Sequence, residues 1–455
     1  MASALSFLYN NILSIVMLVL LIATGVYLSI KSRFFQFRKF GYCAKNTVGS
    51  LLDSKQHEKD SQSVSPFQAV TTALAGTIGT GSIAGVATAL VAGGPGAIFW
   101  MWISALLGMV TKYSEIVLSL KYRETTKDGA FVGGPMYYIQ NGLGKKWLAV
   151  AFAIFAMIAC IGTGNATQSN SISLVLNNTL QISPYITGAV LTVLVAMVIL
   201  GGVKRIANIN EKLVPFMAVF FVLISVVALC CNFTKLPSAL ALIFAEAFNL
   251  KPVLGGVAGY GIFTAMRYGV GRGVFTNEAG LGSAPIAHAA SSAKDPVRQG
   301  LWGVFEVFIT TIVICTMTAL VVLTSDAYQA GFLGGVFAYN GAALSSVAFN
   351  EAVPVIGDVG VTVATMFFSL STILGWAYYG EVSIGYIFQK KRKLAVRIYR
   401  MVYVGFTFVG AVVGIEMVWL VADIFNILMA LPNLIALVAL SKVIVNTTKA
   451  HFANQ

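Results

Sequence analysis

Residues 67–90 read FQAVTTALAGTIGTGSIAGVATAL, a stretch long enough to cross a bilayer that carries four glycines in its middle and no charge. Hydrocarbon offers no water to the backbone groups that a break in a helix frees, so such a break is tolerated only where it lines a cavity or is covered by protein. The segment from Ile78 to Ser82 would present carbonyl groups from one half-helix and N–H groups from the other, which suit a cation and a carboxylate. The stretch therefore predicts a binding site, with close helix packing by small residues as the alternative.

The composition indicates a membrane protein. Hydrophobic residues make up 57% of the 455 residues and charged residues only 10%, which excludes a soluble domain and is typical of a helical protein with many spans. The net charge of +13 does not indicate a nucleic-acid partner, because the basic residues cluster in short loops between apolar runs, a signal of membrane topology. The five cysteines show no spacing typical of a disulfide framework or a metal site.

The apolar runs predict an all-α polytopic membrane protein with 11 transmembrane helices. One N-terminal helix is followed by two groups of five, and a discontinuous helix opens each group; the second break is expected at residues 267–273, RYGVGRG. Such a 5+5 arrangement is typical of transporters built from an inverted repeat. The expected spans are residues 8–30, 67–90, 95–120, 147–175, 184–202, 213–231, 255–290, 297–323, 359–388, 398–415 and 419–441.

The chain is thereby divided into five segments. Residues 1–65 would hold the N-terminal transmembrane helix and a cytoplasmic amphipathic helix, 66–232 the first five-helix repeat, 233–254 an external linker helix, 255–445 the second repeat and 446–455 a cytoplasmic tail. The stretch 133–146, GGPMYYIQNGLGKK, is expected to be a loop, because its glycines, its proline and two tyrosines disfavour a regular helix.

The positions of lysine and arginine predict the orientation. In this topology they number seven in residues 31–65, six in 112–146, three in 204–212, two in 294–298, six in 390–400 and two in 442–449, all on one side. The opposite side would hold only Lys235 and Lys251, and Arg267 and Arg272 lie at the expected second break. The N-terminus is therefore expected outside and the C-terminus in the cytoplasm.

Polar residues around the second break are the first group of candidate functional residues. Arg267, Arg272, Asn277, Glu278 and His288 would lie at or near membrane depth, where polar groups are costly and usually functional. The alternative is structural, with Glu278 pairing with an arginine to hold the break together.

A second group lies in the span over residues 359–388. Ser369, Ser371 and Thr372 present hydroxyls near its middle, and together they suggest a cation site facing the helix that carries Gln168. A hydroxyl also commonly bonds to the carbonyl one turn earlier, which is the structural alternative for each. No catalytic arrangement or dinucleotide spacing is found, so the chain is not expected to be an enzyme.

Several motifs together resemble the alanine/glycine:cation symporter family of amino-acid carriers, over about residues 8–445. They are GTGSIAGVATAL (79–90), GGPMYY (133–138), GTGNATQSN (162–170), VFTNEAGLGSAPIAHA (274–289) and STILGWAYYGE (371–381). The resemblance implies the leucine-transporter fold with an extra N-terminal helix, in a bacterial inner or archaeal plasma membrane. It implies Na⁺- or proton-coupled uptake of alanine or glycine, bound between the two broken helices. We expect a monomer, with membrane lipid, the amino acid and Na⁺ as its partners.

The resemblance also implies which residues bind. The substrate would contact Gly79, Thr80, Gly81, Gln168, Phe275, Thr372 and Trp376. Backbone N–H groups around the two glycines would bind the substrate carboxylate, and Gln168 would bind polar atoms of the substrate. The rings of Phe275 and Trp376 would close over the substrate side chain. The coupling Na⁺ would be held by carbonyl groups of Ala75, Ile78 and Phe368 and by the hydroxyls of Ser371 and Thr372.

One departure from the family concerns Ser82, because the family usually has asparagine at this position, GTGN in place of GTGS. Stoichiometry and selectivity are open for that reason. Proton coupling through Glu278 or Glu115 is a rival within the same class, although the hydroxyls favour Na⁺. A channel fits less well, because it would need a continuous polar lining or a ring of charges.

Overall fold

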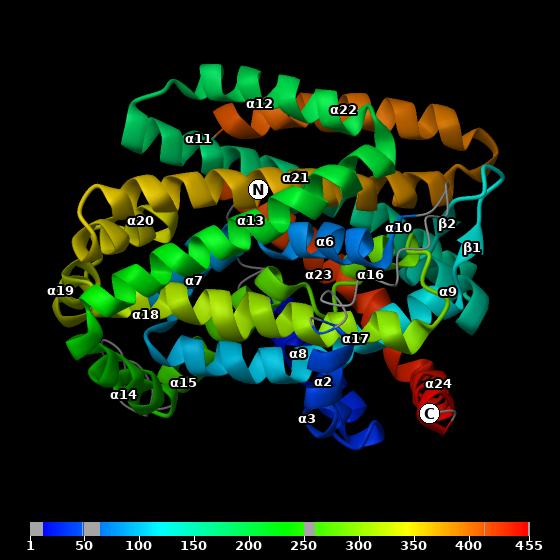
Figure 1. Ribbon diagram of the computed structural model, residues 1–455, viewed down its shortest axis with the longest axis horizontal. Coiled ribbons are helices and arrows are strands. Elements are labelled where there is room, and N and C mark those ends of the chain that lie inside the picture. The colour runs from blue at the N-terminus through cyan, green and yellow to red at the C-terminus, as the bar shows by residue number, and fades with distance from the viewer. Residues whose placement is uncertain (1–11, 48, 50–63, 250–259, 414, 454–455) are drawn as a thin grey trace.

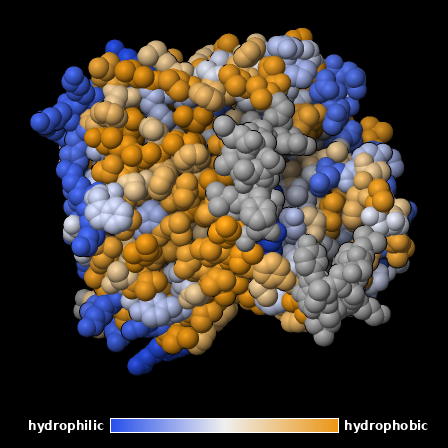
Figure 2. Space-filling model, turned by 180° about the vertical axis from the view of Figure 1, so that it is seen from behind, coloured by the Kyte–Doolittle hydropathy of each residue, from blue (hydrophilic) through white to orange (hydrophobic). Residues whose placement is uncertain are grey.

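The computed structural model describes residues 12–47, 49, 64–249, 260–413 and 415–453. Its long helices run side by side along the longest axis of the molecule (Figure 1). The β1–β2 hairpin and α9 lie at one end of this bundle, here called the hairpin end, and α14, α19 and α20 lie at the other (Figure 1). Hydrophobic side chains cover the broad middle of one face, and hydrophilic ones line its edge on the hairpin side (Figure 2).

The first half of the chain contains the N-terminal helices and the first broken helix. Its elements are α2 (Ser14–Lys31), α3 (Phe35–Arg38), α4 (Phe40–Asn46), α6 (Pro66–Thr77), α7 (Ala84–Gly93), α8 (Gly96–Lys121), β1 (Glu124–Thr125), β2 (Phe131–Val132), α9 (Pro135–Leu143), α10 (Lys146–Ile161), α11 (Thr167–Leu180), α12 (Pro184–Ile199), α13 (Gly202–Cys231) and α14 (Leu236–Ala247).

The second half contains the other broken helix and the longest span. Its elements are α15 (Tyr260–Asn277), α16 (Ala284–Ala289), α17 (Pro296–Val307), α18 (Thr316–Thr324), α19 (Asp326–Gly334), α20 (Gly341–Ala352), α21 (Ile356–Ile387), α22 (Arg392–Val412), α23 (Ile415–Ala439) and α24 (Ser441–Ala453).

The helical membrane fold is confirmed. Among the described residues, eight helices are long and apolar enough to cross a membrane. Pro184–Ile199 and the half-helices α6, α7 and α16 are shorter, and α15, with 18 described residues, is not among the eight. The count of 11 spans and the repeat therefore stay predictions. Within the expected linker over residues 233–254, the structure forms the short helix α14, and residues 250–254 lie outside the described residues. Residues 446–453 continue α24, which begins at Ser441.

The first break lies where the sequence predicts it, and its first half has a well-formed start. Ser65 caps α6, because its hydroxyl accepts the Gln68 N–H at 3.1 Å while its own N–H donates to Gln68 Oε1 at 3.0 Å. Pro66 occupies the first helical position, where its missing N–H costs nothing. The helix then ends at Thr77.

The expected position of the second break is wrong. Helix α15 runs without interruption through residues 267–273, and the break lies at residues 278–283. Two of the three glycines in the earlier segment serve packing: a Cβ on Gly269 would overlap the Ala97 carbonyl oxygen of α8, and one on Gly273 would lie 3.2 Å from Met101 Cγ. Small residues one turn apart let two helices approach closely. The chain turns instead at Glu278, Gly280 and Gly282, whose φ values are +58°, +93° and +82°.

The expected loop at residues 133–146 is also wrong, since most of it forms α9. Pro135 is the first residue of this helix, a position that tolerates proline. Gly134 precedes it with φ +118°, and Gly144 ends it in the left-handed conformation. The glycines and the proline therefore delimit a helix and do not prevent one.

Helices α10 and α11 form one continuous span through a π-helical turn at residues 162–166. Such turns are frequent at functional sites. A Cβ on Gly164 would overlap the Trp376 side chain, so this turn brings α21 close to α10.

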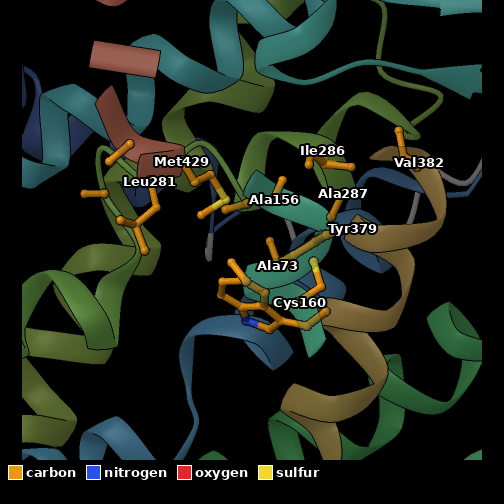
Figure 3. Close-up of a cluster of buried hydrophobic side chains, with 14 of the residues drawn as sticks. Ala73, Ala156, Cys160, Leu281, Ile286, Ala287, Tyr379, Val382 and Met429 are labelled. Carbon is orange, nitrogen blue, oxygen red and sulfur yellow. The ribbon is translucent and has the colours of Figure 1, made fainter. Parts of the chain in front are cut away.

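Apolar side chains pack between the breaks and the neighbouring spans. Ala73 of α6, Ala156 and Cys160 of α10, and Tyr379 of α21 belong to one buried cluster with Leu281, Ile286 and Ala287 (Figure 3). Because this cluster joins both broken helices to α10 and α21, it fixes where the two breaks lie relative to one another.

We predict that Gly280→Ala lowers the free energy of unfolding by about 1–3 kcal/mol, because φ is +93° and a Cβ would lie 2.6 Å from Leu21 Cδ2. Gly271→Ala is the matched control in α15, where a Cβ would meet nothing within 4 Å, and we expect it to be neutral or slightly stabilising. Thermal unfolding in detergent compares the two. Equal melting temperatures would show that the bend at residue 280 does not require glycine.

Candidate functional site

The first break leaves backbone groups without partners in their own helix. Ile78 follows α6 with φ −85° and ψ 74°, and Gly79 is extended with φ −116° and ψ −162°. A single 3-10 turn, Thr80–Ser82, then leads into α7. The last carbonyl groups of α6 and the first N–H groups beyond it must find partners elsewhere, since the membrane interior offers none.

Side chains from two other helices reach these groups. The Thr372 hydroxyl of α21 lies 2.9 Å from the Ala75 carbonyl oxygen, and Gln168 Oε1 of α11 accepts the Thr80 N–H at 3.3 Å. Gly79 lies between them, because a Cβ there would be 2.6 Å from Thr372 Oγ1 and 3.4 Å from Gln168 Oε1. Four of the residues expected to bind substrate therefore meet at one point.

The other expected substrate residues lie around the same break. A Cβ on Gly81 would be 3.0 Å from Phe275 Cδ1 of α15. Trp376, one turn after Thr372 on α21, donates its indole N–H toward the Gly76 carbonyl at 3.4 Å. Both aromatic rings therefore approach the glycine-rich segment, one from each of two neighbouring helices.

The oxygen atoms expected to hold a cation are largely grouped as well. The hydroxyls of Ser371 and Thr372 lie 2.9 and 2.8 Å from the Phe368 carbonyl oxygen, and Thr372 also reaches Ala75 on α6. Ile78 is fully buried just beyond α6. This set offers hydroxyl and carbonyl oxygens, which are the groups that unwound helices present to Na⁺.

Three expected polar candidates lie away from this cluster. Ser369 is buried and has no hydrogen-bond partner among the described residues. Arg267 lies over the Tyr268 ring. Arg272 lies 3.9 Å from an Asp423 carboxylate oxygen, with its guanidinium 5.3 Å from the centre of the Trp419 ring.

Buried charged groups of α8 hold the second break. Lys112 Nζ donates to the Asn277 carbonyl at 2.9 Å, where α15 ends, and a cation is favourable at a helix C-terminus. Glu115, nearly one turn further along α8, accepts the Gly280 N–H at 3.1 Å. Asn433 of α23 completes the turn by donating to Glu115 and, at 2.9 Å, to the Gly280 carbonyl.

Glu278 links the second break to the first. Its carboxylate accepts hydrogen bonds from the Ser283 hydroxyl at 2.5 Å and from the Trp376 indole at 2.8 Å, and Glu278 is 1% exposed. The structural alternative, in which Glu278 pairs with an arginine, is wrong for the described residues. Because Trp376 also contacts the Gly76 carbonyl, one side chain touches both breaks.

A buried ion-pair network behind the second break has partners that the sequence did not reveal. Lys112 Nζ lies 3.0 Å from Glu306 Oε2 of α17, and His288 Nε2 of α16 lies 2.7 Å from Glu306 Oε1. Gln299 Nε2 lies 2.9 Å from His288 Nδ1. Lys112, expected in a basic cytoplasmic segment, is instead buried in α8. Its place inside an apolar run was the signal that could have identified it.

The two broken helices are also tied together at the hairpin end. Val64, just before α6, pairs with Ser291, just after α16, in a parallel bridge. Arg123 donates to the Ser291 carbonyl at 2.6 Å and to the Ala293 carbonyl at 2.9 Å, and its guanidinium lies 4.0 Å from the centre of the Phe131 ring. Partial burial lowers the pKa of this guanidinium.

A cavity of about 860 Å³ opens at the other end of the bundle, beside α20. Ser171 of α11, less than one turn after Gln168, lines it, and so do Arg272 and Trp419. Since the Trp419 ring lies 5.3 Å from the Phe275 ring, aromatic side chains stand between this cavity and the first break.

Comparison with known sequences identifies the family. The sodium:alanine symporter family model matches residues 1–455. The chain belongs to the sodium:alanine symporter family. Members of this family are transporters and not enzymes. The sodium/alanine symporter AgcS of Methanococcus maripaludis is 45% identical, with 95% of this chain and 93% of that protein covered. The probable sodium/glutamine symporter GlnT of Bacillus subtilis is 36% identical, with 97% and 89% covered.

Solved structures of transporters share the fold of this symporter-family chain. MhsT in complex with L-phenylalanine superposes with a TM-score of 0.58 at 13% identity, covering 85% of this chain and 98% of MhsT. A Na⁺-coupled sialic acid symporter gives a TM-score of 0.58 at 12% identity, with 95% and 98% covered. Both have the leucine-transporter fold, so the expected fold family is confirmed.

We predict that Lys112→Met costs about 3–5 kcal/mol of stability, because it leaves the Glu306 carboxylate buried without its lysine. Adding Glu306→Gln should recover part of this loss, since the uncompensated charge is then removed. Lys235→Met is the control: its pair with Asp326 is 47% and 83% exposed, so we expect less than about 1 kcal/mol. Thermal unfolding in detergent measures all three, and equal losses for both lysines would contradict the buried ion pair.

Proposed function

We propose that this chain is a secondary-active symporter that couples Na⁺ entry to the uptake of small neutral amino acids, alanine and glycine, by alternating access. The observation that carries this proposal is the position of Thr372. Its hydroxyl lies 2.9 Å from the Ala75 carbonyl of the first half-helix, and it borders the extended backbone at Gly79. One side chain therefore adjoins both the cation ligands and the backbone that would receive the substrate.

The cation would be Na⁺, held by oxygen atoms. Carbonyl groups of Ala75, Ile78 and Phe368 and the hydroxyls of Ser371 and Thr372 supply them. The C-terminal end of α6 adds a partial negative charge to this group. This set of ligands contains no carboxylate. The positive charge of the bound ion is therefore not neutralised by its ligands and can attract the substrate carboxylate.

The substrate would be a small amino acid. Its carboxylate would accept hydrogen bonds from backbone N–H groups of the turn that includes Gly79, Thr80 and Gly81, as is usual at the start of a half-helix. Gln168 would exchange its present bond with the Thr80 N–H for polar atoms of the substrate. Phe275 and Trp376 would limit its side chain to about the size of a methyl group.

The relatives support the cation and the substrate class. The name of the archaeal relative includes sodium and alanine, whereas the Bacillus relative at 36% identity is a probable sodium/glutamine symporter. Alanine is therefore the first substrate to test, and glutamine the natural competitor.

The topology proposed is one N-terminal helix and two five-helix repeats, with the hairpin end in the cytoplasm and the N-terminus outside. The charged loops of the hairpin end support it. The divisions at residues 65, 232, 254 and 445 keep each broken helix at the start of its repeat, and a monomer is sufficient because every proposed ligand lies in one chain.

A second candidate is proton-coupled uptake through Glu278. Its buried carboxylate bonds to Trp376 and is not paired with a basic side chain among the described residues. The deciding experiment is uptake of labelled alanine into proteoliposomes, with an imposed Na⁺ gradient compared with a pH gradient in Na⁺-free buffer. Accumulation of alanine with the Na⁺ gradient alone supports a coupling Na⁺ at the Thr372 site. Accumulation with the pH gradient alone supports proton coupling through Glu278.

We predict that Thr372→Ala raises the Na⁺ concentration for half-maximal uptake by about tenfold. The reason is that a contact between a hydroxyl and a charged group contributes about 1.5 kcal/mol to the binding free energy. Ser383→Ala is the control: among the described residues, this buried hydroxyl of α21 bonds only to the Tyr379 carbonyl of its own helix. Thr372→Ser should keep near-normal Na⁺ dependence. An unchanged Na⁺ dependence in Thr372→Ala would remove this residue from the ion site.

Gly79→Ala tests the substrate side. The added Cβ would lie 2.6 Å from Thr372 Oγ1, so we expect uptake to fall by at least about tenfold with the protein still inserted and folded. Gly85→Ala lies in the same broken helix, where a Cβ meets nothing within 4 Å, and should transport normally. Labelled alanine uptake per inserted protein compares them; normal uptake by Gly79→Ala would exclude close approach of a ligand to this backbone.

A further inference from the structure

A second cavity, of about 510 Å³, lies at the hairpin end and shares no residue with the proposed transport site. The hairpin, the turn between α12 and α13, the end of α21 and the first turns of α22 surround it. Its charged lining residues are Asp128, Glu381, Arg392, Lys393, Arg397 and Arg400. Basic groups therefore outnumber acidic ones.

Two of these basic groups have carboxylate partners. Arg400 makes two hydrogen bonds of 2.7 Å to Glu381, and Lys393 lies 3.2 Å from Asp128. Arg392 and Arg397 make no ion pair with any described residue. Among the described residues, the cavity therefore has two guanidinium groups without a carboxylate in ion-pair contact, and Arg392 also interacts electrostatically with Glu381.

The sequence of α22 places these charges where they repel one another. All four basic groups fall within its first nine residues, in which Lys393 and Arg397 are one turn apart. Like charges at this spacing destabilise a helix, and cations at a helix start oppose its dipole. An anion bound between them would relieve both effects.

Exposed apolar side chains lie close to the cavity in sequence. Leu200 lines the cavity and is 62% exposed, and Leu394 and Ile398, each next in the chain to a lining residue of α22, are 53% and 49% exposed. A free phosphate ion would gain nothing from these side chains, whereas acyl chains would pack against them.

We propose that this cavity binds the phosphate group of an anionic phospholipid, with Arg392 and Arg397 as its ligands and the acyl chains along Leu200, Leu394 and Ile398. Arginine binds phosphate oxygens through paired N–H groups, and basic pockets between spans bind anionic head groups. Cytoplasmic loops are also generally enriched in basic residues. If that enrichment alone attracted the lipid, every basic side chain of this region would contribute equally to its binding.

The test measures binding of an acyl-labelled phosphatidylglycerol to the purified full-length protein by fluorescence anisotropy in neutral detergent. Arg392→Gln/Arg397→Gln should weaken binding about 25-fold, since each arginine near a head group contributes about fivefold. The control is Lys390→Gln/Lys391→Gln, which removes the same charge from the turn before α22 but no lining residue; it should change binding less than about twofold.

Three outcomes overturn the proposal: equal weakening by both double variants, equal binding of labelled phosphatidylcholine, or competition by glycerol 3-phosphate at low millimolar concentration. The last would assign the cavity to a soluble phosphate. Melting temperatures show whether each variant is folded. If Arg392→Gln/Arg397→Gln is not folded, the single variant Arg397→Gln, whose side chain is exposed, should still weaken binding about fivefold.

Discussion

A backbone group freed inside a membrane needs a partner from the protein, and both breaks in this chain depend on that constraint. At the first break the partners are neutral: the Thr372 hydroxyl donates to the Ala75 carbonyl, and Gln168 Oε1 accepts the Thr80 N–H. At the second break they are charged, with Lys112 on the last carbonyl of α15. The positions of α8, α11 and α21 follow from this requirement, because each must deliver a side chain to a particular backbone atom.

The difference between the two sets of partners suggests how the breaks divide their roles. A neutral hydrogen bond contributes only about 1 kcal/mol net, so a bound ion or carboxylate can replace it at little cost. Separating Lys112 from Glu306 in a buried site costs several times more. The first break is therefore suited to exchange its partners for cargo, whereas the second, held also by Glu115 on the Gly280 N–H, is suited to stay fixed.

The sequence predicted the first break correctly because four glycines fall within one uncharged spanning run, and the family motifs predicted the residues that meet there. The second break was misplaced because Gly269 and Gly273 pack α15 onto α8. Close helix packing and a break in a helix both produce closely spaced glycines in the sequence. The pairing of Lys112 with Glu306 joins helices far apart in the chain. No local pattern specifies such a contact.

Trp376 makes the two breaks interdependent. Its indole N–H lies 2.8 Å from Glu278 Oε1 and 3.4 Å from the Gly76 carbonyl. A carboxylate accepts a hydrogen bond more strongly than a neutral carboxyl group does, so a proton on Glu278 would shift the indole toward Gly76, the residue next to the proposed cation ligand Ala75. If Na⁺ binding moves that half-helix, linkage requires the proton and the Na⁺ to affect each other's binding equally. Sensitivity of uptake to pH is therefore compatible with a transporter driven by Na⁺ alone, and it does not by itself identify the proton as the coupling ion.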